Sequence, residues 1–330
     1  LLFSTNSPGS NCFFGNALRA VGIFQGSEGG TWVSPPLLLH TAAAGSCLFS
    51  ASGAHTPRGF EFAASASDGS LTAGTLTINF DKQTNTWSAS NLASTPISLP
   101  AACASPALDA RSMAGTYDVR LNPQVPTPAR IAVLAFDAVS GASRSTCAAS
   151  LSSSGGWSAA APVWDNGSDT SGNPVTADPA VVMDNNGNAL LAGVRRTNNA
   201  YELATAFLPA AGAQWQIEAS QPAFGETQPA LAFDANGTAT LLYRTRPMAA
   251  DTFTTVYAAR RAADGSWGAR QRLIDGDGDT RFPRLGVAGN GDVLALFSYA
   301  ESPAPFQVYT ARFSGGLWGA AQPLQPTGSP

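Results

Sequence analysis

The chain has 330 residues, a formal net charge of −4 and a sequence pI near 5.1, and its hydrophobic content of 44% is ample for a packed core. Charged residues make up only 12% of the chain and Lys82 is the single lysine, so the basic surface typical of nucleic-acid binding is missing. No run of about 18 apolar residues occurs, which excludes a membrane-spanning helix.

Six of the seven tryptophans recur at one position of a degenerate repeat, each shortly after a turn that contains Gly, Asp or Asn. The gaps between them are 55, 70, 58, 52 and 51 residues, and the six are Trp32, Trp87, Trp157, Trp215, Trp267 and Trp318. A repeat of this length is typical of a propeller blade. We expect these indoles to pack between blades, whereas Trp164 breaks the pattern and is expected to face a ligand.

The predicted strands are less regular in the first half of the chain than in the second. The first repeat contains four candidate strands, at 1–6, 11–18, 19–24 and 31–38. The third repeat carries about 18 extra residues between 131–137 and Trp157. In the second half, three segments read as strand, turn and strand, each with an Asn-Gly turn, at 179–194, 229–243 and 283–297. Asn-Gly between apolar runs strongly indicates a β-hairpin.

These elements predict an all-β fold, a six-bladed β-propeller built from four-stranded antiparallel blades. We expect one domain over residues 1–330, because a propeller is a single closed ring. The approximate blade bounds are 1–40, 41–96, 97–163, 164–219, 220–273 and 274–330.

The four cysteines form no CxxC motif, so neither a zinc knuckle nor a thioredoxin-type site is supported. Pairing neighbours in sequence predicts the disulfides Cys12–Cys47 and Cys103–Cys147, and paired cysteines favour a secreted, periplasmic or cell-surface protein. Four buried thiols in a cytosolic protein remain the alternative. If the protein is exported, numbering from Leu1 describes a mature or trimmed chain.

Long, variable connections are expected to converge on one face of the ring, and they combine arginines, carboxylates and aromatic residues. Such a mixture suits carbohydrate, because an aromatic ring stacks on a sugar while polar groups bind its hydroxyls. The candidate ligand-binding residues are Trp164, Asp165, Arg195, Glu226, Arg246, Arg281, Tyr299 and Glu301. Solvated loops without a ligand remain the alternative.

The segment DGDGDT places Asp275, Asp277 and Asp279 on alternate residues, a spacing that suits a simple calcium site. The glutamate that would complete an EF-hand is absent, because residue 286 is glycine. We therefore expect no cofactor other than, at most, Ca²⁺. The two histidines, His40 and His55, occupy no recognisable catalytic motif, and no nucleotide-binding motif occurs.

The segments ADGSWG at 263–268 and SGGLWG at 314–319 resemble degenerate Asp-box turns. Through them the chain resembles bacterial secreted propellers of the sialidase-like and lectin-like kind. That resemblance implies an arginine trio, which Arg195, Arg246 and Arg281 would supply, and a Tyr-Glu pair, which Tyr299 and Glu301 would supply. The Arg-Ile-Pro segment of sialidases is missing.

The sequence predicts a secreted bacterial propeller without enzymatic activity that recognises carbohydrate or another extracellular or surface partner. Two alternatives stay open. One is a glycoside hydrolase of the sialidase-like kind or a polysaccharide lyase, although no catalytic pair of acids can be chosen from the spacing. The other is a structural or surface-assembly protein, because a fold by itself does not determine function.

Overall fold

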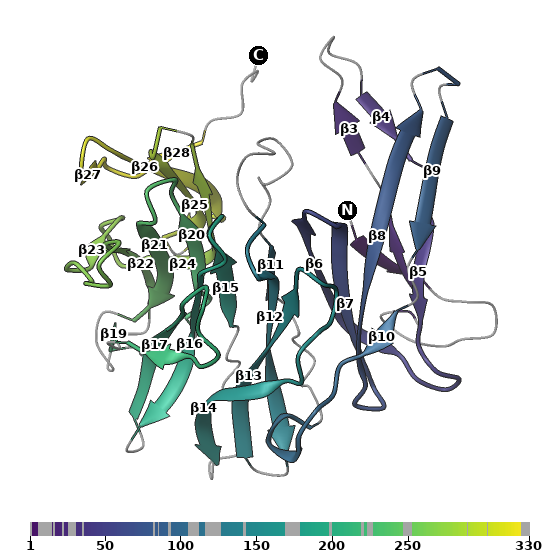
Figure 1. Ribbon diagram of the computed structural model, residues 1–330. Helices are drawn as coiled ribbons and strands as arrows, with labels where there is room; N and C mark the ends of the chain where they lie inside the picture. The colour runs from purple at the N-terminus through teal and green to yellow at the C-terminus, as the bar shows by residue number, and fades with distance from the viewer. Residues whose placement is uncertain are drawn as a thin grey trace. The chain divides into compact units, whose positions relative to one another are not determined.

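The computed structural model shows a chain of β-strands with one short 3-10 helix, η1 (Ala101–Cys103), among the residues it describes (Figure 1). The described residues are all except 1, 6–14, 16, 22, 26–30, 35, 82, 85, 92–93, 105–111, 116–126, 141–142, 169–178, 198–199, 219–220, 223–226, 247–252, 289, 302 and 325–330. The chain divides into two compact units, the N-terminal unit (1–168 with 185–187) and the C-terminal unit (169–184 with 188–330). Within the described part, no helix has the length and hydrophobicity needed to cross a membrane.

The N-terminal unit contains three antiparallel sheets in chain order and a separate hairpin. The first sheet consists of β1 (Leu2–Thr5), β2 (Ala17–Ala20) and β5 (Leu37–Thr41), and the hairpin consists of β3 (Ile23–Gln25) and β4 (Thr31–Val33). The second sheet consists of β6 (Leu48–Thr56), β7 (Gly59–Ala66), β8 (Leu71–Asp81), β9 (Thr86–Asn91) and β10 (Thr95–Pro96). The third sheet consists of β11 (Ser112–Gly115), β12 (Arg130–Ser140), β13 (Ser143–Ser152) and β14 (Ala161–Ser168).

The C-terminal unit contains three further antiparallel sheets. The fourth sheet consists of β15 (Ala180–Met183), β16 (Ala189–Thr197), β17 (Ala200–Leu208), β18 (Gln216–Ile217) and β19 (Gln221–Pro222). The fifth consists of β20 (Ala230–Phe233), β21 (Ala239–Thr245), β22 (Thr255–Arg261) and β23 (Gln271–Arg272). The sixth consists of β24 (Asp279–Val287), β25 (Val293–Ala300), β26 (Gln307–Ser314), β27 (Leu317–Trp318) and β28 (Gln322–Pro323).

The main strands of each sheet pair in chain order as a meander, with β9 and β10 both on β8, β18 and β19 both on β17, and β27 and β28 both on β26. Within each unit, the first strand of one sheet lies beside the first strand of the next. In the N-terminal unit β6 contacts both β1 and β11, and in the C-terminal unit β20 contacts both β15 and β24. These six sheets are the blades of a six-bladed β-propeller, which confirms the predicted all-β fold class. The extent of the single domain and the blade bounds remain predictions.

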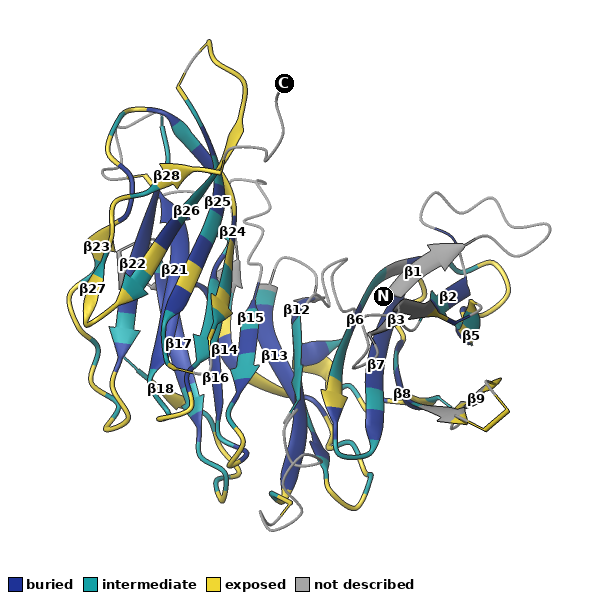
Figure 2. Ribbon diagram, turned by 90° about the horizontal axis from the view of Figure 1, so that it is seen from above, coloured by how far each residue is buried: buried dark blue, intermediate teal, exposed yellow. Residues whose placement is uncertain are grey.

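The hairpins of the C-terminal unit follow directly from the sequence. Gly187, Gly237 and Gly291 have φ angles of +89°, +76° and +85°, a region that glycine enters without steric cost. They lie in the turns between the first two strands of blades four, five and six, as the Asn-Gly dipeptides predict. Every residue of β21 is buried, because a strand inside a blade is covered on both faces (Figure 2).

The predicted disulfide Cys103–Cys147 is present and joins η1 to β13 in blade three. Both cysteines are fully buried. Cys47 is also disulfide-bonded, while its predicted partner Cys12 lies outside the described residues.

The extra residues predicted between 131–137 and Trp157 are not found there, because β12 begins 27 residues before Trp157 (157 − 130), much as β16 begins 26 residues before Trp215 (215 − 189) and β21 28 residues before Trp267 (267 − 239). The longer connection of blade three is the one from the end of β11 at Gly115 to the start of β12 at Arg130.

Three of the repeated tryptophans occupy equivalent places. Trp157 and Trp267 form isolated bridges to the strands that precede them, and Trp318 pairs with Phe313. All three are partly buried against apolar clusters, which agrees with the expected packing role. The structure does not describe the side chains of Trp32 and Trp87.

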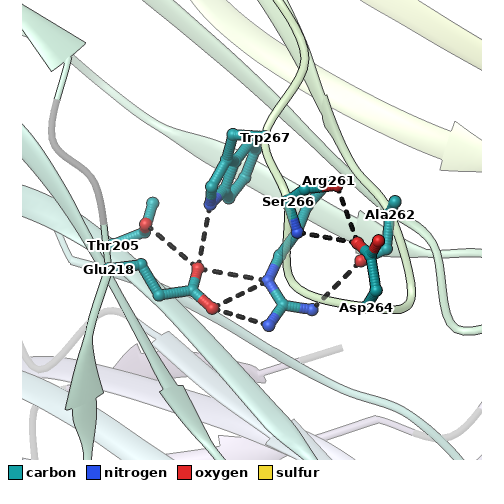
Figure 3. Close-up of polar contacts among 7 residues, drawn as sticks. All are labelled: Thr205, Glu218, Arg261, Ala262, Asp264, Ser266 and Trp267. Atoms are coloured by element: carbon teal, nitrogen blue, oxygen red, sulfur yellow. Dashed lines mark hydrogen bonds and ion pairs between the residues drawn. The ribbon is translucent and has the colours of Figure 1, made fainter.

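A polar cluster joins blades four and five (Figure 3). The carboxylate of Glu218, just after β18, accepts hydrogen bonds from Arg261 Nε at 2.9 Å and from Arg261 Nη2 at 2.6 Å. Trp267 Nε1 donates to the same carboxylate at 2.9 Å. The Arg261 guanidinium also lies 4.3 Å from the centre of the Phe207 ring in blade four. The side chains of Arg261 and Glu218 are only 5% and 14% exposed, so this ion pair is largely shielded from water.

Blade two contains an acidic side chain in its interior. Glu61 on β7 is fully buried and accepts hydrogen bonds from Thr75 Oγ1 at 2.6 Å and Thr56 Oγ1 at 3.1 Å. Burial raises the pKa of Glu61, because desolvation disfavours the charged form more than the two hydroxyls and the nearby Arg58 favour it.

Replacing Glu61 by glutamine is expected to flatten the dependence of stability on pH. Because the folded-state pKa of Glu61 is raised, its contribution to stability is greatest below the ordinary glutamate pKa and is lost as pH rises through the folded-state value. Urea unfolding of the wild type and of Glu61→Gln, from acid to neutral pH, measures this difference. The partly exposed Glu202→Gln variant is the control, and parallel profiles for Glu61→Gln and wild type would contradict the expectation.

Candidate ligand-binding site

A pocket of about 440 Å³ lies between blades five and six, within the C-terminal unit. Arg272 on β23 and Asp275 in the loop after it form the blade-five side. The blade-six side comes from the end of β25, from β26 and from β27, with the side chains of Tyr299, Glu301, Tyr309 and Trp318. The pocket therefore combines three aromatic residues with one cationic and two acidic side chains.

The aromatic side chains of this pocket are held by packing within blade six. The Tyr309 ring lies 5.4 Å from the Tyr299 ring in an edge-on arrangement and is stacked 6.3 Å from Phe297. Trp318 packs against Phe313 with ring centres 5.5 Å apart. Because these rings rest on the buried residues of β25 and β26, the aromatic wall is already formed before any ligand arrives.

Tyr299 and Glu301 form a hydrogen-bonded pair at the end of β25. Residues two apart on a strand project to the same side, and here the Tyr299 hydroxyl donates to Glu301 Oε1 at 2.7 Å. Burial, together with the Glu301 carboxylate, raises the pKa of Tyr299 to about 12. The phenol consequently stays protonated at neutral pH and remains a hydrogen-bond donor.

Two glycines of the DGDGDT segment allow the loop to lie directly on this pair. A Cβ atom at Gly276, which has a φ of +108°, would be 2.3 Å from the Tyr299 hydroxyl and 2.7 Å from Glu301 Oε1. A Cβ atom at Gly278 would be 2.4 Å from the Ala300 carbonyl oxygen and 2.5 Å from the Tyr299 ring. Both positions therefore require glycine, and the loop covers Tyr299 so that only 6% of it is exposed.

Arg272 holds the same loop in place. Its Nε donates to the Ile274 carbonyl at 2.9 Å and its Nη2 donates to the Gly276 carbonyl at 2.5 Å. Among the described residues, no carboxylate lies within ion-pair distance of this guanidinium. Arg272 thus positions the loop and also supplies the positive charge of the pocket, beside the carboxylates of Asp275 and Glu301.

The alternating aspartates do not converge as a calcium site would require. Asp279 accepts hydrogen bonds from the Thr254 hydroxyl and, at 3.1 Å, from Arg281 Nε, so its carboxylate is already engaged. No group of three or more His, Cys, Asp or Glu side chains within the described part is arranged to hold a metal ion. The feature of the DGDGDT segment that the structure accounts for is its two glycines, Gly276 and Gly278, which let the loop lie against Tyr299 and Glu301.

The prediction that Trp164 faces a ligand is wrong. Trp164 is only 4% exposed and lies within β14, where it pairs with Thr146 of β13. The segment around it reads as a turn because of its Asn, Gly and Ser residues, yet β13 is long enough to pair with it and make it the fourth strand of blade three. Asp165 is the next residue of β14 and is exposed.

The remaining predicted residues do not line the pocket. Arg195 on β16 lies 3.8 Å from the Glu202 carboxylate on β17, and Arg246 is exposed just after β21. The Arg281 guanidinium lies 4.4 Å from the centre of the Phe306 ring. Glu226 lies outside the described residues. Of the eight predicted ligand-binding residues, Tyr299 and Glu301 meet in the pocket, together with Asp275 from the proposed metal trio.

Three pocket residues escape sequence-based prediction. Trp318 belongs to the repeat, whose pattern predicts a packing role, and Tyr309 lies within an apolar strand pattern. Arg272 follows a repeat turn with no motif around it. Only their convergence in space identifies them as candidate ligand contacts.

No family model matches the sequence, and no curated protein does either. Among solved structures, the chain is similar to the fucose-recognising Aleuria aurantia lectin, a six-bladed β-propeller (12% identity, 100% of this chain, 96% of that chain, TM-score 0.48). It is also similar to an ulvan lyase (9% identity, 84% and 71% covered, TM-score 0.47). A third similar structure is the Penicillium chrysogenum α-L-arabinanase bound to arabinobiose (14% identity, 62% and 68% covered, TM-score 0.42). These identities and scores are low, so the argument for function rests on the pocket itself.

Proposed function

We propose that this protein binds carbohydrate in the pocket between blades five and six. The observation that supports this proposal is a pocket of about 440 Å³ that combines aromatic and charged side chains. Tyr309 and Trp318 line it together with Arg272, Asp275 and Glu301. Aromatic rings offer a surface for the C–H face of a sugar, while the charged groups offer donors and acceptors for its hydroxyls. The volume suits a ligand of one or two sugar rings.

Hydrolysis is the second candidate, because the Tyr299–Glu301 hydrogen bond of 2.7 Å resembles an activated nucleophile pair. A phenol acts as a nucleophile only after it loses its proton, and the raised pKa of Tyr299, about 12, opposes that loss at neutral pH. This electrostatic state supports a binding role for the pair. Release of reducing ends from polysaccharide at neutral pH, abolished by Tyr299→Phe, would instead support hydrolysis.

The proposed setting is outside the cytosol, as a secreted, periplasmic or cell-surface protein of a bacterium. The Cys103–Cys147 disulfide supports this, because disulfides persist mainly in oxidising compartments.

One turn supports the proposed Asp-box character of the repeat. The Asp264 carboxylate accepts a hydrogen bond from the Ser266 backbone amide at 2.9 Å and another from the Ser266 hydroxyl at 2.7 Å. An assembly partner in place of a glycan is the remaining alternative.

A glycan array, probed with the wild type with added calcium and again with chelator, tests the proposal. We expect saturable binding to one sugar class, unaffected by chelation, and at least a tenfold loss of affinity for Trp318→Ala and Glu301→Gln. Trp318→Tyr is the matched control, because it keeps an aromatic surface at the same place and should retain most binding. An array without signal in both conditions would contradict glycan binding, and loss of signal on chelation would restore a calcium role for the DGDGDT segment.

A further inference from the structure

Two strained residues that do not line the pocket lie at one place in the C-terminal unit. Gln228 and Phe282 are the non-glycine residues with positive φ in the described chain, with values of 39° and 54°. The Phe282 amide donates a hydrogen bond to Gln228 Oε1 at 3.1 Å, so the two residues are in direct contact. Phe282 also precedes Pro283, which restricts its backbone further. Such conformations carry an energetic cost, and backbone strain of this kind is concentrated at functional sites.

A bulge in the innermost strand of blade six presents the Phe282 ring to solvent. The pairing of β24 with β25 shifts register between Arg281 and Arg284, which leaves Phe282 and Pro283 outside the ladder. Phe282 is 58% exposed although it is a large apolar residue. A bulge can redirect a side chain away from the sheet, and this one holds an aromatic ring in water at an energetic cost.

Neutral polar groups accompany the exposed ring. Gln228 uses its carbonyl oxygen to accept from Phe282, which directs its amide nitrogen toward other acceptors. The neighbouring Thr227 hydroxyl is buried and has no hydrogen-bond partner within the described part of the chain. Arg281, beside Phe282, is balanced by Asp279, whose carboxylate it contacts at 3.1 Å. The surroundings of the ring therefore carry hydrogen-bonding capacity without a net charge from this pair.

We infer that Phe282 and Gln228 form a second saccharide-binding site, which takes a neutral pyranose ring. The apolar face of the sugar stacks on Phe282, and a hydroxyl accepts a hydrogen bond from the Gln228 amide nitrogen. Gln228 lies just before β20 and Phe282 lies on β24, and neither residue lines the pocket, whose blade-six side comes from β25, β26 and β27. A protein with both sites would bind a polysaccharide at two points and gain avidity.

Saturation-transfer NMR with methyl α-pyranosides of glucose, galactose, mannose and fucose tests the inference. We expect transfer to the ring C–H protons of at least one probe in the wild type and in Phe282→Trp. The signal that remains in Trp318→Ala, which changes only the pocket, should fall at least tenfold in the double variant Trp318→Ala/Phe282→Gly.

The Phe282→Gly variant also reports on folding, because glycine adopts a positive φ without strain. Its thermal midpoint should equal or exceed that of the wild type. A lower midpoint would assign Phe282 a structural role and overturn the inference. An unchanged signal when Phe282→Gly is added to Trp318→Ala, or no transfer to any of the four probes in the wild type, would also overturn it.

Discussion

Replacing Glu218 by alanine is expected to destabilise the C-terminal unit by about 3–5 kcal/mol. Glu218 is the common acceptor for Arg261 and Trp267, with contacts of 2.6 to 3.1 Å, and Arg261 is only 5% exposed. Truncation would leave the guanidinium buried without a counter-charge and the indole N–H without its acceptor. The free energy of unfolding, measured in urea at neutral pH, gives the size of the effect.

Two further variants distinguish the effect of losing the ion pair from the effect of losing side-chain packing. The double variant Glu218→Leu/Arg261→Met removes both charges and should recover much of the loss, because paired apolar residues often replace a buried ion pair at little cost. The Asp292–Arg312 pair in blade six, in which the Arg312 side chain is 66% exposed, is the control, and Arg312→Ala should leave the unfolding curve nearly unchanged. A loss for Glu218→Ala as small as that control would show that the cluster contributes little.

Removing the Cys103–Cys147 disulfide is expected to destabilise the N-terminal unit by about 4 kcal/mol. The bond closes a loop of 44 residues, and opening it increases the conformational freedom of the unfolded chain. Both cysteines are fully buried, so the Cys103→Ala/Cys147→Ala variant also loses packing around η1. Urea unfolding of this variant and of the wild type, both without reductant, measures the difference.

Reduction of the wild type is a poorer test, because Cys47 is also disulfide-bonded and would respond. The single variants provide the control, since Cys103→Ala and Cys147→Ala each break the same bond and should match each other closely. A double variant that is as stable as the wild type would show that the long pairing of β12 with β13 holds blade three without the crosslink.

Local sequence patterns predicted the fold well because blades are built from near neighbours in the chain. Asn-Gly dipeptides set the hairpin turns, and alternating or continuous apolar runs set the strands around them. The disulfide Cys103–Cys147 followed from proximity in sequence. Each of these features depends on contacts within one blade, which short segments of sequence encode directly.

The same local patterns could not predict contacts between blades. The DGDGDT segment looked like a cation loop because carboxylates carry the recognisable chemistry, whereas the structural requirement rests on Gly276 and Gly278 beneath Tyr299 and Glu301. Trp164 looked like a loop residue because β14 has turn-forming composition. The Glu218–Arg261 pair spans 43 residues and two blades, so no local spacing indicates it.

Equivalent repeat positions differ in how they treat the tryptophan of the following blade. Glu218 is the third residue after Trp215, and it caps the indole of the following blade; the third residue after Trp267 is Arg270. The Arg270 guanidinium turns back onto Tyr257 of its own blade, 4.4 Å from the ring centre, and Trp318 of the following blade lines open space. At this repeat position a carboxylate engages the tryptophan of the following blade, whereas an arginine leaves the next tryptophan at the edge of the pocket.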